Sequence, residues 1–88
     1  MWTVVWRPSA EQDLASVWLA AKDRAAVTRA SDEIETVLRQ VPELVGEVRF
    51  DTVRRVVVSP LGVEFEVIDQ DRMVWVLAAW DASKSSND

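Results

Sequence analysis

The sequence predicts an α+β fold in which a helical hairpin packs on one face of a mainly antiparallel four-stranded sheet. Two patterns along the chain support this prediction. Apolar residues recur at the helical period of about 3.6 between residues 9 and 41, and at the strand period of about 2 after Gly46. The 88 residues are assigned to one domain at residues 1–82 and a polar tail at residues 83–88. The predicted element order is β-α-α-β-β-β.

The N-terminal half is predicted to form one strand and both helices. Residues 2–6 are β-branched and aromatic, which favours a strand. Ser9 is followed three residues later by Gln12, the capping-box pattern of a helix start. Asp23 is a typical N-cap for the second helix, and Pro42 ends it. The buried faces are expected to be Ala10, Leu14, Val17, Trp18 and Ala21 on the first helix, and Val27, Ala30, Ile34, Val37, Leu38 and Val41 on the second.

Three more strands are predicted in the C-terminal half. A β-branched run at residues 50–59 leads into the tight-turn sequence of residues 59–62. The next strand alternates apolar residues with glutamates, so one of its faces is buried and the other is open. After a turn at residues 69–72, residues 73–80 are apolar on both faces, as in an interior strand. Two-residue turns would place Ser59 opposite Gly62 and Asp69 opposite Arg72.

This pairing sorts the strand residues into two faces. The core face would carry Val56, Val58, Val63, Phe65, Val67, Val74, Val76 and Ala78. The open face would carry Arg55, Val57, Glu64, Glu66, Ile68, Met73, Trp75 and Leu77. Arg55 is expected directly opposite Glu66.

An apolar stripe on the open face, made of Ile68, Met73, Trp75 and Leu77, is the candidate surface for partner binding. The alternative is that the C-terminal tail or a slipped strand register covers this stripe. The other four tryptophans, Trp2, Trp6, Trp18 and Trp80, are expected in the core.

Composition excludes several kinds of chemistry. The chain has no Cys and no His, which removes thiolate and imidazole ligands and the commonest general base, so neither a metal nor a cofactor is expected. A net charge of −5 is a poor match to a nucleic-acid binder. Residues 1–7 lack the pattern of a signal peptide and no apolar run has the length of a membrane span, so a cytoplasmic location is expected.

Charged side chains on the predicted strands are the remaining candidates for a site. Arg49, Arg54 and Arg55 form a basic cluster that could bind phosphate or a target, or could pair with neighbouring carboxylates. Glu64 and Glu66 lie two residues apart on one strand face, as an acid/base pair would, but a solvated strand face has the same pattern.

Residues 2–80 together resemble the RelE/ParE superfamily of bacterial toxins. The resemblance rests on residues 5–10, on Leu14, Trp18, Ile34 and Pro42, and above all on the segments at residues 46–49, 59–63 and 65–69. It implies a toxin of a type II toxin–antitoxin system that is neutralised by a cognate antitoxin. RelE-type members are metal-independent ribonucleases that cut messenger RNA in the ribosome with clustered Lys and Arg, whereas ParE-type members inhibit DNA gyrase. Both a monomer and a homodimer are compatible with the sequence.

The chain departs from the ribonuclease pattern of this superfamily. Gly62 stands where the resemblance leads us to expect an arginine, and Asp81 and Ala82 stand in place of a basic segment. The chain also has no Tyr. The alternative interpretation is therefore a catalytically decayed toxin-like module that only binds a protein partner.

Overall fold

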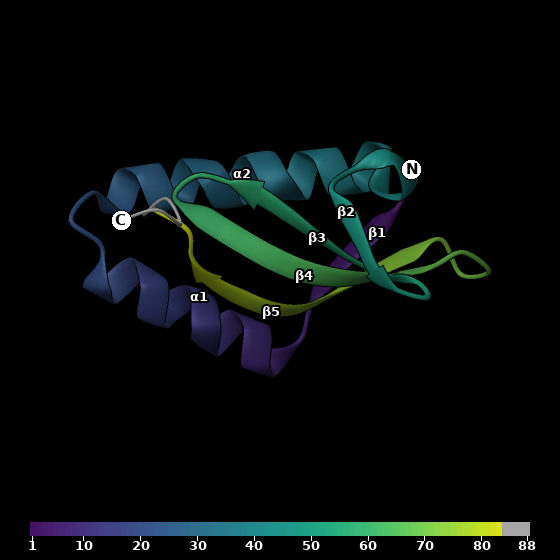
Figure 1. Cartoon of the computed structure of the whole chain (residues 1–88), viewed down its shortest axis with the longest axis horizontal. Coiled ribbons are helices and arrows are strands. Elements are labelled where there is room, and N and C mark those ends of the chain that lie inside the picture. The colour runs from purple at the N-terminus through teal and green to yellow at the C-terminus, as the bar shows by residue number, and fades with distance from the viewer. Residues whose placement is uncertain (84–88) are drawn as a thin grey trace.

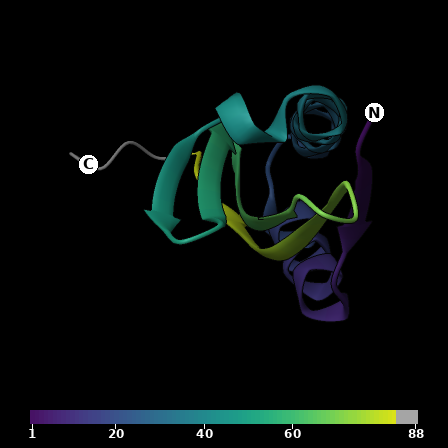
Figure 2. The ribbon, with the colours of Figure 1, turned by 90° about the vertical axis from the view of Figure 1, so that its right-hand side faces the viewer.

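A computed structural model of the protein describes residues 1–83. Two helices cover one face of a five-stranded sheet, and the other face of the sheet is open (Figures 1 and 2). The strand order is β1-β5-β4-β3-β2, with β1 parallel to β5 and the other pairs antiparallel. The elements are β1 (Thr3–Trp6), α1 (Pro8–Ala20), α2 (Arg24–Gln40), a short 3-10 helix η1 (Pro42–Leu44), β2 (Glu47–Phe50), β3 (Val53–Val58), β4 (Leu61–Ile68) and β5 (Met73–Asp81). The predicted α+β class, with a helical hairpin on a mainly antiparallel sheet, is confirmed, but the order of elements contains one strand more than predicted.

The sheet has one strand more than the sequence predicts. The additional strand is β2 at Glu47–Phe50, just before the predicted strand at residues 50–59. That predicted strand begins only at Val53, as β3, because the chain reverses at Asp51 and Thr52. Asp51 takes a left-handed backbone conformation with φ of 49°, which aspartate tolerates better than most residues. This turn contains neither Gly nor Pro, and a pattern of β-branched residues does not mark it.

The two helices begin in different ways. Asp23 caps α2 as predicted, since its carboxylate accepts a hydrogen bond from the Ala26 backbone N–H at 3.0 Å. The capping box predicted at Ser9 is wrong: Arg7 is the N-cap of α1, no side chain caps this helix, and Pro8 is its first residue. Proline suits that position because its backbone dihedral is already helical and its missing N–H needs no partner. No helix within residues 1–83 is long and apolar enough to cross a membrane.

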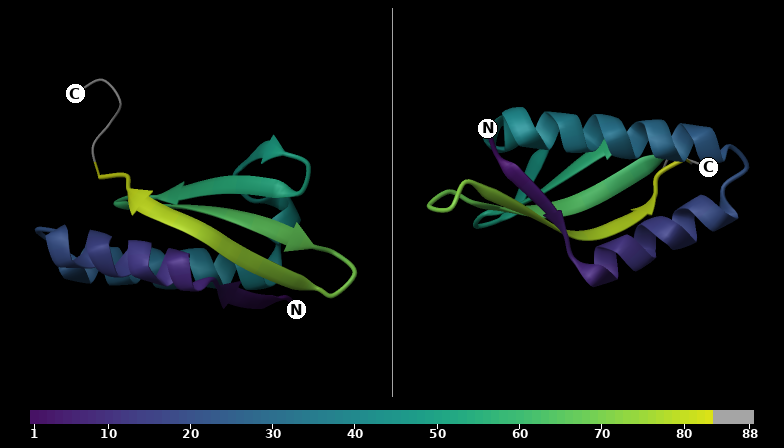
Figure 3. Two further views of the ribbon diagram at one scale, coloured as in Figure 1. Left: turned by 90° about the horizontal axis from the view of Figure 1, so that it is seen from below. Right: turned by 180° about the vertical axis from the view of Figure 1, so that it is seen from behind.

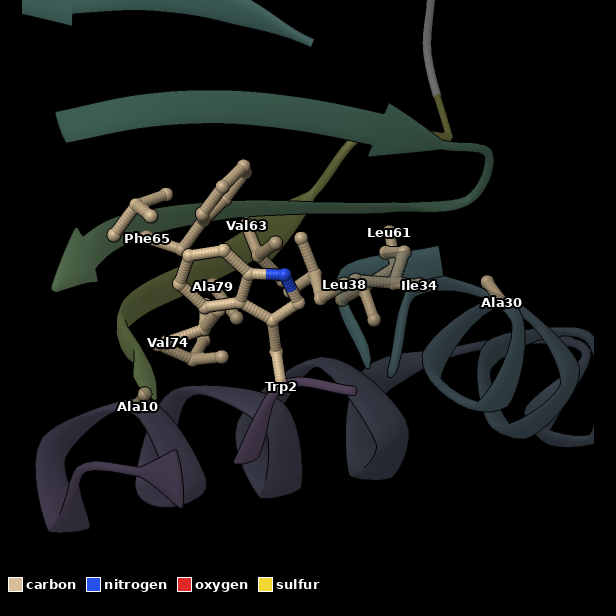
Figure 4. Close-up of a cluster of buried hydrophobic side chains, with 12 residues drawn as sticks. Trp2, Ala10, Ala30, Ile34, Leu38, Leu61, Val63, Phe65, Val74 and Ala79 are labelled. Carbon is tan, nitrogen blue, oxygen red and sulfur yellow. The ribbon is translucent and has the colours of Figure 1, made fainter. Parts of the chain in front are cut away.

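The core lies between the helices and the sheet (Figure 4). Phe65 at the centre of β4 is fully buried, and Trp2 reaches into the same cluster with 6% of its surface exposed. Most of the predicted core positions are confirmed, and the buried cluster consists of Trp2, Ala10, Ala30, Ile34, Leu38, Leu61, Val63, Phe65, Val67, Val74, Val76 and Ala79. Val56, Val58 and Trp6 are partly buried against it.

The two-residue loop of the β3–β4 hairpin lies one residue earlier in the chain than expected. The loop is Ser59-Pro60, so Val58 pairs with Leu61, and Arg55 stands opposite Glu64 instead of Glu66. This shift of two residues keeps every side chain on its predicted face. The next hairpin has the predicted register, with Ile68 opposite Met73.

A β-bulge interrupts β5 at Leu77. Phe65 pairs with Val76 but Glu64 pairs with Ala78, so Leu77 is an extra residue on β5. Beyond it the two faces exchange: Ala79 is buried, and Trp80 lies opposite Gly62 on the open face. The predictions that Ala78 and Trp80 face the core are therefore wrong.

Helix α1 explains why the bulge forms there. Strand β1 ends at Trp6, opposite Val76, so the following part of β5 has no strand on that side. The N-terminal half of α1 lies there instead. Its Asp13 carboxylate accepts a hydrogen bond from the Ala79 backbone N–H at 3.1 Å, and the Ser9 hydroxyl donates to the Leu77 carbonyl at 3.5 Å. These contacts provide partners for backbone groups that the sheet leaves unpaired.

Candidate functional site

The structure separates the three arginines of the predicted basic cluster. Arg49 and Arg55 lie on the open face of the sheet, beside Glu64. Arg54 points to the helix side, where its Nε donates a hydrogen bond to the Val45 carbonyl at 2.9 Å. Two arginines, not three, are therefore available to a site on the open face.

Arg49 is paired with a carboxylate. Its Nε lies 3.2 Å from Oε2 of Glu64, and the side chains are 46% and 25% exposed. Glu66 is also partnered, because its carboxylate accepts a hydrogen bond from the Thr52 hydroxyl at 2.9 Å. Of the two interpretations of the charged residues, these contacts favour strand residues paired with one another over a cationic site or an acid/base pair.

Arg55 lies against the indole of Trp80. Its guanidinium carbon is 5.4 Å from the ring centroid, and its Nε is buried with no hydrogen-bond partner among residues 1–83. The Trp80 ring lies over Gly62: a Cβ atom at position 62 would come within 2.4 Å of the indole. Position 62 therefore has no room for a side chain while Trp80 occupies the open face, which explains the glycine where the resemblance implies an arginine.

The apolar stripe of the open face is less exposed than its sequence predicts. Ile68 and Met73 face each other across the hairpin, and the guanidinium of Arg7 lies 5.4 Å from the ring of Trp75. Ile68, Met73, Trp75 and Leu77 are all half-buried. The open face instead exposes Val57 and Phe50, at 52% and 59%, toward its β2 side.

A groove between α1 and α2 is a feature that the sequence did not predict. Its volume is about 540 Å³, and it is lined by Trp6, Glu11, Leu14, Ala15, Trp18, Val27, Thr28, Ser31 and Glu35. Trp18 is 38% exposed in this groove, so the prediction that it belongs to the core is wrong. The two helices diverge from their connection (Figure 3). The helical pattern of α1 marks an apolar face but does not distinguish a core from a groove.

Contacts of an arginine and a glutamate link residues at the two ends of this groove. At one end Arg24 stacks on Trp18 at 4.6 Å and donates hydrogen bonds to the carbonyls of Trp18 and Leu19, at 3.1 and 3.0 Å. At the other, the Trp6 indole N–H donates to the Glu35 carboxylate at 3.2 Å, and Glu35 also pairs with Arg39. The groove therefore combines an apolar lining with two carboxylates, those of Glu11 and Glu35.

Several of the arginines lie against tryptophan rings. Four pairs are present within residues 1–83, the fourth being Arg72 over Trp2 at 4.8 Å. Proteins average roughly one such contact per 70–80 residues. These contacts place arginines against rings instead of leaving them free for phosphate. Within the same residues, no group of three carboxylates is placed to hold a metal ion.

Within residues 1–83, the two arginines of the open face are engaged by neighbouring side chains. Phosphoryl transfer requires cations at the developing charge and a group that carries the proton. Here Arg49 is paired with Glu64 and Arg55 is stacked under Trp80. The surface combines rings, aliphatic side chains and neutralised charges, which suits contact with another protein.

Comparison with known proteins identifies the fold. No protein-family model and no curated protein sequence matches the chain. Among solved structures, it is similar to one of the RelBE2 toxin–antitoxin complex of Mycobacterium tuberculosis, with TM-score 0.73 and 16% identity over 91% of this chain and 96% of the other. The isolated E. coli RelE toxin matches with TM-score 0.70 and 14% identity over 99% and 90%. A chain of the chromosomal ParDE system of P. aeruginosa matches with TM-score 0.65 and 21% identity over 92% and 96%. The resemblance seen in the sequence is thus confirmed at the level of structure: the chain has the RelE/ParE fold.

Proposed function

We propose that this protein is the toxin subunit of a type II toxin–antitoxin pair and is neutralised by a cognate antitoxin. The observation that carries this proposal is the match over nearly the whole chain to proteins from such pairs, the RelBE2, RelE and ParDE structures. The apolar groove gives the proposal a physical basis, since a groove that exposes 38% of a tryptophan is typical of a surface that a partner covers.

Two surfaces are candidates for the antitoxin. The groove between α1 and α2 can take apolar side chains of a partner helix against Leu14, Trp18 and Val27. The apolar stripe of Ile68, Met73, Trp75 and Leu77 is the second candidate, on the opposite side of the sheet. We place the first contact in the groove, because Trp18 is more exposed than any residue of the stripe.

The target of the proposed toxin is a protein, with DNA gyrase as the first candidate, and not messenger RNA. This choice rests on the engaged state of Arg49 and Arg55 and on the net charge of −5, because phosphate contacts dominate the affinity of nucleic-acid binders. A residual ribonuclease would depend on those two arginines.

A second candidate function is a decayed toxin that retains only antitoxin binding. The observation that favours it is the Trp80 ring, which fills the space over Gly62 and stacks against Arg55. Such a module would bind the same partner without affecting growth.

The experiment that separates these functions is induced expression with and without the product of the neighbouring reading frame. The toxin proposal expects growth arrest that co-expression relieves, inhibition of supercoiling by purified protein, and no cleavage of cellular messenger RNA. Growth arrest with messenger cleavage that Arg49→Ala or Arg55→Ala abolishes would instead identify a ribonuclease. Partner binding without arrest identifies the decayed module, and neither arrest nor binding contradicts both functions.

The antitoxin surface has its own matched variants. Trp18→Ala should weaken binding of the neighbouring gene product at least tenfold, whereas Leu19→Ala, next to it on α1 but outside the groove lining, should change it less than twofold. Trp75→Glu tests the stripe in the same binding assay. Loss of binding in Trp75→Glu alone, with Trp18→Ala unchanged, would move the interface to the stripe.

A further inference from the structure

The C-terminal half of β5 has a sequence that fits two registers. Ala79 now faces the core opposite Val63, and Ala78 faces the open side opposite Glu64. If the bulge at Leu77 were removed, residues 78–81 would move one position along β4, a distance of about 3.3 Å. Ala78 would then replace Ala79 opposite Val63, so one alanine would exchange for another in the core. This part of the strand is therefore weakly specified by its own pattern.

The same slip would carry Trp80 to the helix side of the sheet. Trp80 would take the place of Asp81, opposite Leu61. A hollow of about 620 Å³ lies there, between the α1–α2 connection and the β3–β4 turn, and its lining includes Val17, Ala20, Ala21, Val27, Pro60 and Asp81. An apolar cavity of about 150 Å³ already holds benzene, so this hollow has room for an indole ring.

Specific contacts favour the register that the structure has. The Asp13 carboxylate accepts from the Ala79 N–H, and Asp81 accepts from the Ser83 N–H at 2.8 Å. On the open face, Trp80 packs on Gly62 and against Arg55. The slipped register would lose these contacts, but it would gain an uninterrupted ladder between β4 and β5 and a buried indole. Because the gains and losses oppose each other, the free energies of the two registers can lie within a few kilocalories per mole of one another.

We propose that residues 78–81 form a two-register switch that moves Trp80 between the open face and the hollow on the helix side. The slipped register uncovers Gly62 and releases the Arg55 guanidinium from the ring, leaving a cationic depression on the open face. A partner that binds the hollow favours the bulged register, and a partner that fills the depression over Gly62 favours the slipped one. The two faces of the sheet are thereby coupled. This inference does not depend on the proposed toxin function.

Gly62→Ala is the variant that tests the switch. In the bulged register its new methyl group would lie 2.4 Å from the indole Cε2 of Trp80, too close for the ring to stay. In the slipped register position 62 faces the small side chain of Ala79. Val57→Ala is the matched control. Val57 on β3 is the pairing partner of Gly62 on β4, and its change to alanine removes side-chain atoms instead of adding them.

The readout is fluorine NMR of the full chain labelled with 5-fluorotryptophan, with the Trp80 signal assigned from Trp80→Phe. In Gly62→Ala we expect the Trp80 signal alone to move to a buried environment, with contacts from the ring to the methyl groups of Val17 and Val27. In the wild type and in Val57→Ala we expect contacts from the ring to Gly62. Saturation transfer on the wild type should reveal a minor signal at the Gly62→Ala position, populated at about 0.1–10%.

Three results would overturn the switch. The first is a folded Gly62→Ala in which Trp80 keeps its open-face contacts. The second is a Gly62→Ala that does not fold while Val57→Ala does, because the slipped register accepts an alanine at this position and should then support the fold. The third is a wild-type chain with no exchange to the Gly62→Ala signal.

Discussion

Asp13, in the second turn of α1, accepts a hydrogen bond from the backbone N–H of Ala79 on β5, across 66 positions in the sequence. A helix side chain thus takes the place of a pairing strand, because β1 ends at Trp6 and no other strand within residues 1–83 pairs with β5 on that side. The contact fixes the position of the bulge and, through it, the face on which Trp80 lies.

Asp13→Ala should therefore lower the free energy of unfolding by about 1–3 kcal/mol, the usual penalty for leaving a largely buried N–H without an acceptor. Urea denaturation followed by circular dichroism measures this change. Asp13→Asn keeps an oxygen that can accept the bond and should cost less than half as much. Equal losses in the two variants would show that the charge of Asp13, and not its hydrogen bond, stabilises the strand.

The two residues that the sequence predicts as helix caps, Asp23 and Ser9, should respond differently to alanine. Asp23→Ala removes the acceptor for the Ala26 N–H and should destabilise the protein by about 0.5–2 kcal/mol. Ser9→Ala should have a smaller effect, because Ser9 caps no helix. The only side-chain hydrogen bond of Ser9 among the described residues, to the Leu77 carbonyl, is long. Thermal melting of both variants under one set of conditions makes the comparison, and a larger loss for Ser9→Ala would contradict it.

The ion pair between Arg49 and Glu64 should contribute little to stability. Both side chains are partly exposed, so water and salt screen their attraction, and a double-mutant cycle with Arg49→Ala and Glu64→Gln should give a coupling of about 0.2–1 kcal/mol. The coupling should fall toward zero at 1 M NaCl, where the Debye length is about 3 Å. A coupling that persists in high salt would mean that the hydrogen bond, and not the charge, holds the pair.

Ala10 on α1 should not tolerate a larger side chain. It is fully buried where the first turn of α1 meets the sheet, so Ala10→Leu should cost about 1–3 kcal/mol through overpacking. Ala25→Leu, at an exposed position near the start of α2, should be nearly neutral. Chemical denaturation of the two variants tests the difference, which would vanish if α1 could move away from β5 at no cost.

Local patterns predicted much of this fold. The helical period placed Val27, Ile34 and Leu38 in the core, and the strand period did the same for Val63 and Phe65. The turn at Asp51 and Thr52 was not predicted, because an aspartate in the left-handed conformation leaves no distinct signal in a β-branched run. The missed strand β2 follows from that turn.

The candidate site was less predictable than the fold. Arg49, Arg54 and Arg55 are close in sequence, but alternation along β3 places Arg54 on the other side of the sheet. The groove between the helices was not predicted because it depends on how far α1 and α2 diverge, which is set by their packing on the sheet. Trp18 became a groove residue for this reason.

The sequence by itself determined the order of β1, the two helices, β3, β4 and β5, and the core-facing side of β3 and β4. Both follow from the spacing of apolar residues over a few positions. The tertiary structure alone decided the face of Trp80. Two adjacent alanines leave the register of β5 undetermined, and the choice is made by Asp13, which provides an acceptor for the Ala79 N–H, and by Gly62, which leaves space for the ring. Contacts between residues distant in sequence therefore select one strand register where the local pattern of apolar residues allows two.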